Sequence, residues 1–453
     1  MADLSRRTFI KNLAAGTAGL IAAGSGFSFS RDTMDDSVEV LNPCNRVPLS
    51  FIIDDSTALV NMAYYGIPQF KEVFPDRYNQ DWKKLPPEIP DDFVREFGEW
   101  CREHGVKGKY SMVPYPACTG WLHRFIPGWS SGELKRSLKL VRDFMMPDWD
   151  IHPEMISHTR VINTRTGVPY PHATPEYMEN WEWSQDKSSG VLAEYIAYAL
   201  DILKKVDLPC EGITTPGGFG SRNMDNLAMG TLEACRDVFQ TEIPHFFRTL
   251  RTDPDQSVEP ELFHVSGIGT DDPRCSVHII GCTGDWFGGW DGLNPGSADR
   301  FITADLQRGR MVDVIESGQP ALMVCHWPGI YYNGTKLGFN IFKTVVKRLH
   351  QKYNHLIWMK NSEIARYWAC KKLTSIKHSG NNIDINAPFS TNRFTVKVDK
   401  AVGGAQLASA GGKTPLRRVN SPLDLSDGTF YTNRKESMLC FELPKGKSKL
   451  VIG

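Results

Sequence analysis

The pattern of apolar and polar positions predicts that short buried strands alternate with amphipathic helices through most of the chain. The apolar runs expected to form strands are 49–53, 108–113, 151–157, 212–215, 277–282, 321–325 and 356–359. The segments 92–104 and 191–205 repeat apolar side chains three and four residues apart, which is typical of helices with one buried face. Strands that alternate with such helices are typical of βαβ units and a parallel sheet. Residues 45–372 are therefore predicted to form one α/β domain.

The residues after the first predicted strand narrow the choice among α/β folds. Seven strand–helix units fit either an open, doubly wound sheet or a closed or nearly closed barrel, and periodicity does not distinguish the two. A dinucleotide-binding sheet follows its first strand with a glycine-rich turn. Here the strand runs directly into Asp54, Asp55 and Ser56, so a dinucleotide-binding fold is disfavoured.

Residues 1–30 carry the pattern of an export signal. Arg6 and Arg7 precede the apolar stretch 13–23, which is well short of the ~20 residues that span a bilayer. A basic segment followed by a short apolar one is typical of a secretory signal, and the paired arginines resemble the twin-arginine export signal. We therefore expect a signal peptide over 1–30, a mature protein in the periplasm or outside the cell, and no membrane span.

The character of the sequence changes from about Thr374. Glycine and asparagine residues separate short runs of alternating polarity, such as 394–398 and 437–442. This pattern predicts a small antiparallel β module over 374–453. The stretch contains few side chains suited to catalysis, so we expect it to serve packing or accessory binding.

Charge and composition narrow the class of ligand. The chain contains 52 basic and 52 acidic residues, which gives a formal net charge of zero. Proteins that bind nucleic acid usually carry a basic excess because phosphate contacts dominate their affinity, so that role is disfavoured. The 12 Trp residues, beside 14 Tyr and 23 Phe, favour a ligand with flat and weakly charged faces such as a sugar, although most of these rings will be core.

Polar side chains that carry chemistry follow the predicted strands. In barrels of alternating strands and helices, catalytic residues lie where the strands end and the βα loops begin. The residues at these positions are Asp54 and Asp55, His158, Thr215, Asp285 and Trp286, and His326 and Trp327. Their shared position at one end of a barrel predicts a single site.

In their order along the chain, these motifs resemble those of the polysaccharide deacetylase superfamily, whose members are carbohydrate-active enzymes on a distorted seven-stranded barrel. The matching motifs are the apolar strand ending in Asp54 and Asp55, the pair His158 and Thr159, the pair Asp285 and Trp286, and the strand ending in His326. The resemblance implies a distorted (β/α)7 barrel over 45–372 and an oligosaccharide or polysaccharide substrate.

The resemblance also implies roles for four of these residues. Asp54 corresponds to the general base and His326 to the catalytic acid of the family. Asp55 and His158 correspond to ligands of a divalent metal ion, for which zinc is the expected metal. Trp286 and Trp327 directly follow predicted strands and are expected to bind the sugar.

The chain departs from the family in two motifs. The family places a second His four residues after the first, where this chain has Ile162, and an Arg two residues before a proline, where this chain has Thr214. Catalytic metal sites usually have three protein ligands, and His152 and Asn163 are the nearby candidates for the third. Glu182 is a further candidate for contact with substrate hydroxyls.

Three hypotheses for the activity remain. The first is metal-dependent removal of acetyl groups from oligosaccharides or polysaccharides. The second is a carbohydrate dehydratase, in which Asp54 takes a proton from a uronyl or unsaturated uronyl oligosaccharide while His326 protonates the departing hydroxyl. The third is a glycan-binding protein without catalytic activity.

Overall fold

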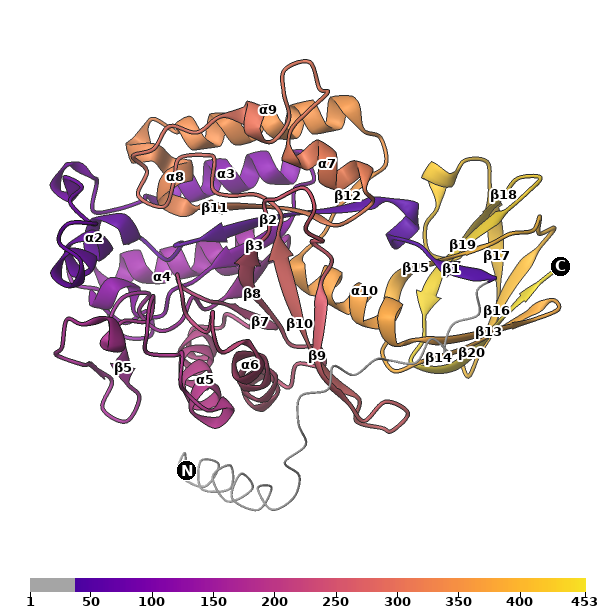
Figure 1. Ribbon diagram of the computed structural model, residues 1–453, viewed down its shortest axis with the longest axis horizontal. Coiled ribbons are helices and arrows are strands. Elements are labelled where there is room, and N and C mark those ends of the chain that lie inside the picture. Colours follow the sequence, from indigo (N-terminus) through magenta and orange to yellow (C-terminus); the bar gives the residue numbers. More distant parts are fainter. Residues whose placement is uncertain (1–36) are drawn as a thin grey trace.

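The structure, a computed structural model, describes residues 37–453, and the signal peptide predicted at 1–30 lies outside that range (Figure 1). Within the described residues, one sheet has five strands, in the order β11-β2-β3-β4 with β12 also paired to β2. A second sheet has four strands, in the order β7-β8-β10-β9. The strands are β2 Val47–Asp54, β3 Gly108–Ser111, β4 Trp149–His152, β7 Gly212–Thr214, β8 His245–Leu250, β9 Glu261–Ser266, β10 Arg274–Gly281, β11 Ala321–His326 and β12 Leu356–Trp358.

The two sheets approach each other at both edges. A bridge between Glu154 and Thr214 connects the chain after β4 to β7. On the other side, the amide of Cys282, which follows β10, donates a hydrogen bond of 2.8 Å to the carbonyl of Leu322 in β11. The result is a nearly closed barrel of mainly parallel strands, in agreement with the predicted α/β class.

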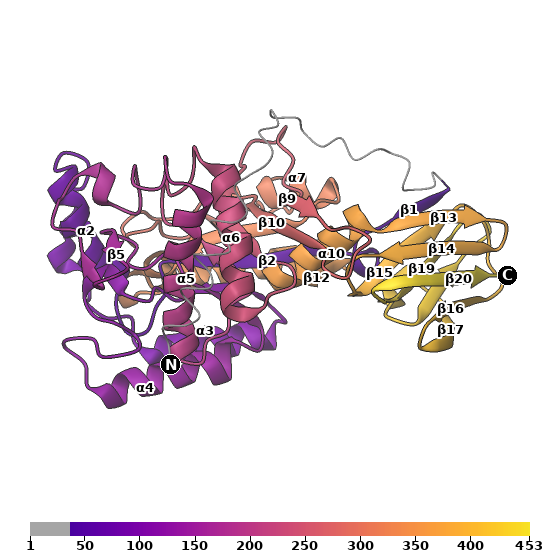
Figure 2. The same ribbon diagram turned by 90° about the horizontal axis from the view of Figure 1, so that it is seen from below.

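Helices cover the outside of the barrel, and α5 and α6 lie side by side on one flank (Figure 2). The α3 helix buries Phe93, Phe97 and Cys101, which lie on one face at helical spacing. At the start of α4, the Ser130 hydroxyl and the Glu133 carboxylate form a reciprocal capping box. None of the helices in 37–453 has the length and hydropathy of a membrane span. The helices are α2 Met62–Val73, α3 Asp91–Glu103, α4 Ser131–Leu140, α5 Ser189–Lys205, α6 Met224–Phe239, α7 Arg310–Glu316, α8 Trp327–Tyr331, α9 Leu337–Lys352 and α10 Asn361–Leu373.

The observed strands differ from the predicted runs in three places. The run at 356–359 forms only the short β12, which pairs with the beginning of β2. The place between β7 and β10 is taken by β8, which the hydrophobic pattern did not predict because only its first half is buried. The run at 151–157 stops early: β4 ends at His152, directly before Pro153, which has no amide hydrogen for a ladder.

The register of β2, β3 and β4 shows which of their side chains point into the barrel. Ile52 of β2 pairs with Lys109 of β3, and Lys109 pairs with Asp150 of β4, so these three side chains share one face. Ile52 packs with Leu322 and Val324 in a buried cluster on this face, whereas alternate residues of β2 pack against the outer helices. Lys109 and Asp150 therefore point into the barrel.

A nine-stranded sheet follows α10 in the described part of the chain, in the order β1-β15-β19-β18-β17-β16-β20-β14-β13. It includes β1, which pairs with β15, so the sheet extends beyond the module predicted at 374–453. It also contains one parallel pair, β17 with β18, among antiparallel ones. The α10 helix lies between barrel and sheet, and its Trp368 shares a buried cluster with residues of both (Figure 1). The strands are β1 Val38–Val40, β13 Ser375–Ser379, β14 Asn382–Ala387, β15 Thr391–Val398, β16 Ala405–Ser409, β17 Gly412–Val419, β18 Thr429–Thr432, β19 Ser437–Leu443 and β20 Gly446–Ile452.

Candidate active site

The end of β2 carries two carboxylates that face different partners. Asp54 is the last residue of the strand and is paired in register with His326, the last residue of β11, on a neighbouring strand about 4.8 Å away. Asp55 follows with φ of +57°, a left-handed conformation that costs a residue other than glycine about 1 kcal/mol. This turn takes Asp55 off the strand, and its carboxylate contacts His158.

A buried lysine that the sequence analysis missed holds Asp54. The Lys109 side chain is fully buried, and its ammonium donates to the Asp54 carboxylate. The same group donates to the carbonyl of Ile53 and to the hydroxyl of Ser111, both at 2.8 Å, so that all of its three hydrogens have acceptors. Burial raises the pKa of Asp54 to about 6, although the Lys109 charge acts in the opposite direction. Lys109 thus fixes the orientation of the Asp54 carboxylate through a direct contact.

Asp55, Glu154 and His158 form a compact cluster of possible metal ligands. The Nε2 atom of His158 lies 2.6 Å from Oδ1 of Asp55 and 3.3 Å from Oε1 of Glu154. The other oxygen of Glu154 accepts the backbone amide of Asp55 at 2.8 Å, which fixes the glutamate against the turn after β2. All three side chains are buried. Their ligand atoms lie within 4.8 Å of one another, close enough to surround one ion.

The third position of this cluster corrects the sequence analysis. Glu154 replaces both candidates, since His152 points to His245 inside the barrel and Asn163 belongs to the short strand β5, Ile162–Asn163. The signal that could have found it is the spacing of four residues between this carboxylate and His158.

Electrostatics within the cluster favour a bound positive charge. Burial lowers the pKa of His158, but the carboxylates of Asp55 and Glu154 outweigh burial and raise it well above its usual value. Burial acts to raise the pKa of Glu154, and hydrogen bonding and charge from His158 outweigh it and lower that pKa to about 2. The two carboxylates therefore keep a cation between them, which is either the imidazolium or a metal ion that displaces its proton.

The loop that carries His158 is held by one buried carboxylate. The Glu179 side chain accepts the backbone amides of Ser157 at 3.2 Å and of His158 at 2.6 Å, and it also accepts the Tyr195 hydroxyl at 2.5 Å. Burial raises the pKa of Glu179 to about 7 against these hydrogen bonds. His158 itself has φ of +65°, and the network around Glu179 maintains this left-handed backbone.

His326 is positioned by Asp285. The Oδ2 atom of Asp285 accepts both the backbone amide of His326 at 3.1 Å and its ring Nδ1 at 2.8 Å, which leaves Nε2 free to face a ligand. Its side chain is 27% exposed, whereas that of Asp54 is 9% exposed. Burial lowers the pKa of His326, but the Asp285 hydrogen bond and the charges of Asp55 and Asp54 raise it to about 10. His326 is therefore protonated at neutral pH.

Two of the predicted substrate-binding residues are engaged in contacts within the protein. Trp327 is fully buried in the core among Phe93, Phe97 and Tyr110, because it directly follows His326 and faces the opposite side. Glu182 is exposed and forms an ion pair with Arg222.

Trp286 is half-buried. The Arg300 guanidinium lies 4.2 Å from the centre of its ring, and Phe301 packs against its edge.

A different set of aromatic rings lies beside His158. Phe70 of α2 is 6.5 Å from the His158 ring, 5.4 Å from Trp181 and 5.9 Å from Trp290, measured between ring centres. Tyr78 packs against the same two tryptophans. Trp181 and Trp290 are half-buried, so each ring keeps some surface exposed. These rings come from three separate segments and could not be grouped from their spacing.

The sequence matches no family model, and no curated protein is significantly similar to it. Solved structures similar to this chain include the following two. A probable polysaccharide deacetylase from Pseudomonas aeruginosa PAO1 has 12% identity and a TM-score of 0.37, over 71% of this chain and 91% of its own. A glycoside hydrolase/deacetylase candidate from Parabacteroides distasonis has 11% identity and a TM-score of 0.39, over 76% and 79%.

Proposed function

We propose that this protein is an exported carbohydrate-active hydrolase of the polysaccharide deacetylase type. It would remove acetyl groups from oligosaccharides or polysaccharides with the help of a divalent metal ion. One observation carries the proposal. The cluster of possible metal ligands, Asp55–Glu154–His158, lies directly beside the acid–base pair formed by Asp54 and His326. The paired arginines near the start of the sequence support export to the periplasm or beyond.

The ligand set fits a catalytic metal ion such as zinc. Two carboxylates and one imidazole nitrogen are ligands that zinc accepts, and catalytic zinc sites combine three protein ligands with an open position. Oδ1 of Asp55 faces Nε2 of His158 at 2.6 Å, so a metal ion that displaces the imidazolium proton would have both atoms as ligands. When bound, a divalent cation supplies Lewis acidity to the acetyl carbonyl and acidifies water.

The residues around this site can perform the proton transfers of acetyl hydrolysis. Asp54 accepts a proton from water as the water oxygen bonds to the acetyl carbon, and Lys109 keeps the carboxylate oriented. His326 donates its proton to the sugar oxygen or nitrogen as the bond to the acetyl carbon breaks. The products are acetate and the free sugar hydroxyl or amine. The rings of Trp181 and Trp290 are placed to stack on a neighbouring sugar.

The register pairing of Asp54 with His326 also supports a second candidate, the dehydratase. The Asp54 carboxylate, with a pKa of about 6, can accept the proton from the acidic carbon of a uronyl sugar. His326 protonates the hydroxyl group, which then leaves as water. This reaction needs the acid–base pair but makes no use of the Asp55–Glu154–His158 cluster. Acetyl hydrolysis uses both the acid–base pair and the cluster of possible metal ligands, and it is the leading proposal.

Product masses distinguish these activities. Purified protein is incubated with acetylated oligosaccharides and, separately, with unsaturated uronyl oligosaccharides, with zinc and after chelation. Release of acetate that depends on zinc supports the proposal. Loss of one water from the uronyl substrates supports the dehydratase. Binding to glycans without any product, across both substrate classes, indicates the non-catalytic alternative.

Replacing Glu154→Gln is expected to weaken zinc binding by at least ~100-fold. An outer partner of a metal ligand already contributes about 10–100-fold to affinity, and Glu154 is placed as a direct ligand. Competition with a chromophoric chelator measures the change. Glu316→Gln, an exposed glutamate on α7, serves as the matched control and should bind like the parent protein. Equal zinc affinity in the Glu154 variant would remove this residue from the metal site.

Replacing Asp285→Asn is expected to move the alkaline limit of activity to lower pH. His326 must be protonated to act as the acid, so activity falls as pH rises through its pKa of about 10. Asparagine removes the charge that holds this proton, so the fall begins closer to the ordinary histidine pKa of about 6.5. The pH profile of kcat/KM tests this, with exposed Asp299→Asn as the control. An unchanged alkaline limb in the Asp285 variant would mean that His326 is not the acid.

A further inference from the structure

A second group of potential metal ligands lies inside the barrel and consists of Asp150, His152 and His245. Asp150 and His152 are alternate residues of β4 and point to the same face, and His245 is the first residue of β8. Both histidines are fully buried and Asp150 is 8% exposed. Lys109 and Ser111 are the register partners of Asp150 and His152, and the Lys109 ammonium contacts both Ser111 and Asp54. The group shares no residue with the Asp55–Glu154–His158 cluster and is separate from it.

The two histidines face each other nitrogen to nitrogen. Nε2 of His152 lies 2.9 Å from Nε2 of His245, and the latter lies 4.0 Å from Oδ2 of Asp150. Two imidazolium ions cannot face each other at this distance, so at least one of the rings is neutral and offers a lone pair to the space between them. Nδ1 of His152 lies 3.3 Å from the Thr214 hydroxyl, a partner that leaves Nε2 to act as a ligand.

We propose that Asp150, His152 and His245 bind a divalent transition-metal ion, at a site distinct from the catalytic cluster. Imidazole and carboxylate together suit zinc, cobalt or nickel more than magnesium or calcium. With metal–ligand bonds of about 2.0–2.1 Å, tetrahedral ligand atoms are about 3.3 Å apart. The separations of 2.9 and 4.0 Å lie on either side of this value, so side-chain shifts of less than about 1 Å would enclose an ion.

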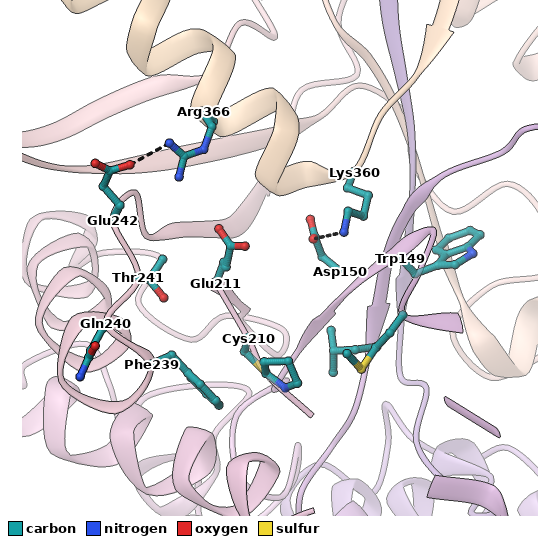
Figure 3. Close-up of a pocket in the computed structure, with 13 residues that line it drawn as sticks. Trp149, Asp150, Cys210, Glu211, Phe239, Gln240, Thr241, Glu242, Lys360 and Arg366 are labelled. Atoms are coloured by element: carbon teal, nitrogen blue, oxygen red, sulfur yellow. Dashed lines mark hydrogen bonds and ion pairs between the residues drawn. The ribbon is translucent and has the colours of Figure 1, made fainter. Parts of the chain in front are cut away.

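A cavity of about 420 Å³ reaches the Asp150 member of this group, while His152 and His245 lie buried behind it (Figure 3). Asp150 and Glu211 both line it, and the Glu211 carboxylate points into the open space in Figure 3. The backbone carbonyl of Glu211 accepts the amide of His245 at 3.3 Å, so the two residues are neighbours. Arg366 is already paired with Glu242 at 2.8 Å and does not neutralise Glu211.

The neighbours of Asp150 are compatible with a bound ion. The amide and hydroxyl of Ser362 donate to its two oxygens at 2.6 and 2.8 Å and fix the carboxylate at the start of α10. The Lys360 ammonium lies 3.8 Å away and its side chain is 27% exposed, so it can turn toward solvent when a metal ion takes its place. A metal ion here would connect β4 to β8 and, through Asp150, to the helix that joins the barrel to the nine-stranded sheet.

Cobalt binding to the full chain tests the inference, because cobalt in a nitrogen–oxygen site gives a visible absorption band. Protein freed of metal by chelation is titrated with cobalt, and bound metal is counted after gel filtration. The expected result is two equivalents in the parent protein and one in His245→Gln, with loss of one component of the absorption band. Exposed His172→Gln is the matched control and should retain both equivalents.

The same titration separates this inference from the proposed catalytic metal. His158→Gln should lose the other equivalent and keep the one at His245. A His245 variant that binds as much cobalt as the parent protein overturns the inference, whatever the His158 variant does. If His245→Gln does not fold, Asp150→Asn keeps the shape of the side chain, with its oxygen accepting the Ser362 amide and its NH2 donating to the Ser362 hydroxyl, and retention of both equivalents in that variant overturns the inference equally.

Discussion

Asp54→Asn is expected to reduce kcat/KM for acetyl release by about 10³-fold, the middle of the range that a positioned general base contributes. Asparagine keeps the shape of the side chain and can still accept a hydrogen bond from Lys109, but it cannot take a proton from water. Acetate release is measured at a temperature at which circular dichroism shows the variant to be folded. Zinc content should remain that of the parent protein, because Asp54 is not among the proposed ligands.

Two comparisons make this result specific. Asp76→Asn changes an exposed aspartate and should have the activity of the parent protein. The double variant Asp54→Asn with Lys109→Met removes both buried charges, and it should be as inactive as Asp54→Asn alone. If the Asp54 variant keeps more than about a tenth of the parent activity, well outside the range for loss of a base, Asp54 is not the base.

Lys109→Met is expected to destabilise the fold by about 3–5 kcal/mol, the cost of leaving one member of a buried ion pair without its partner. Methionine fills a similar volume, but Asp54, the carbonyl of Ile53 and the hydroxyl of Ser111 all lose their donor. The free energy of unfolding is measured by urea titration. Activity should fall as well, because the Asp54 carboxylate is no longer oriented and its protonated form is favoured.

The double variant again provides the decisive comparison. Removing the Asp54 charge as well should restore part of the lost stability, so that the combined effect is smaller than the sum of the two single ones. Lys347→Met, on the exposed side of α9, should change the free energy of unfolding by less than about 0.5 kcal/mol. Additive effects of the Asp54 and Lys109 substitutions would show that the two charges do not stabilise each other.

The site residues that could be predicted from the sequence share one property, because each follows the end of a predicted strand. Asp54, Asp55, His158 and His326 were selected on that ground, and Asp54 pairs in register with His326 while Asp55 contacts His158. Strand ends can be located from local polarity, since a buried apolar run stops at the first charged residue. The chemical roles assigned to these residues remain predictions.

The residues that the sequence did not indicate depend on contacts between distant segments. Lys109 lies within a predicted strand, and its burial follows from the register of β3 against β2 and β4. Glu154 belongs to a stretch of bends whose path is fixed by Glu179, more than twenty residues further along. Trp327 shows the opposite case, because strand alternation alone could have placed it facing away from His326.

The fold was predictable to a similar extent. Regular alternation of strands and helices indicated the α/β class, and most barrel strands coincide with apolar runs. The pattern did not predict β8, whose second half is polar and partly exposed. It also did not predict that β1, from the beginning of the described chain, joins the sheet after α10, since that pairing connects residues more than 350 positions apart.

The most direct test of the central claim is the mass of the products formed from acetylated oligosaccharides by the zinc-loaded protein. The site geometry predicts loss of acetyl groups with matching release of acetate, abolished by chelation and restored by zinc, and reduced about 10³-fold in Asp54→Asn. Acetylated substrates that remain intact while unsaturated uronyl oligosaccharides lose one water, with no dependence on zinc, would contradict it.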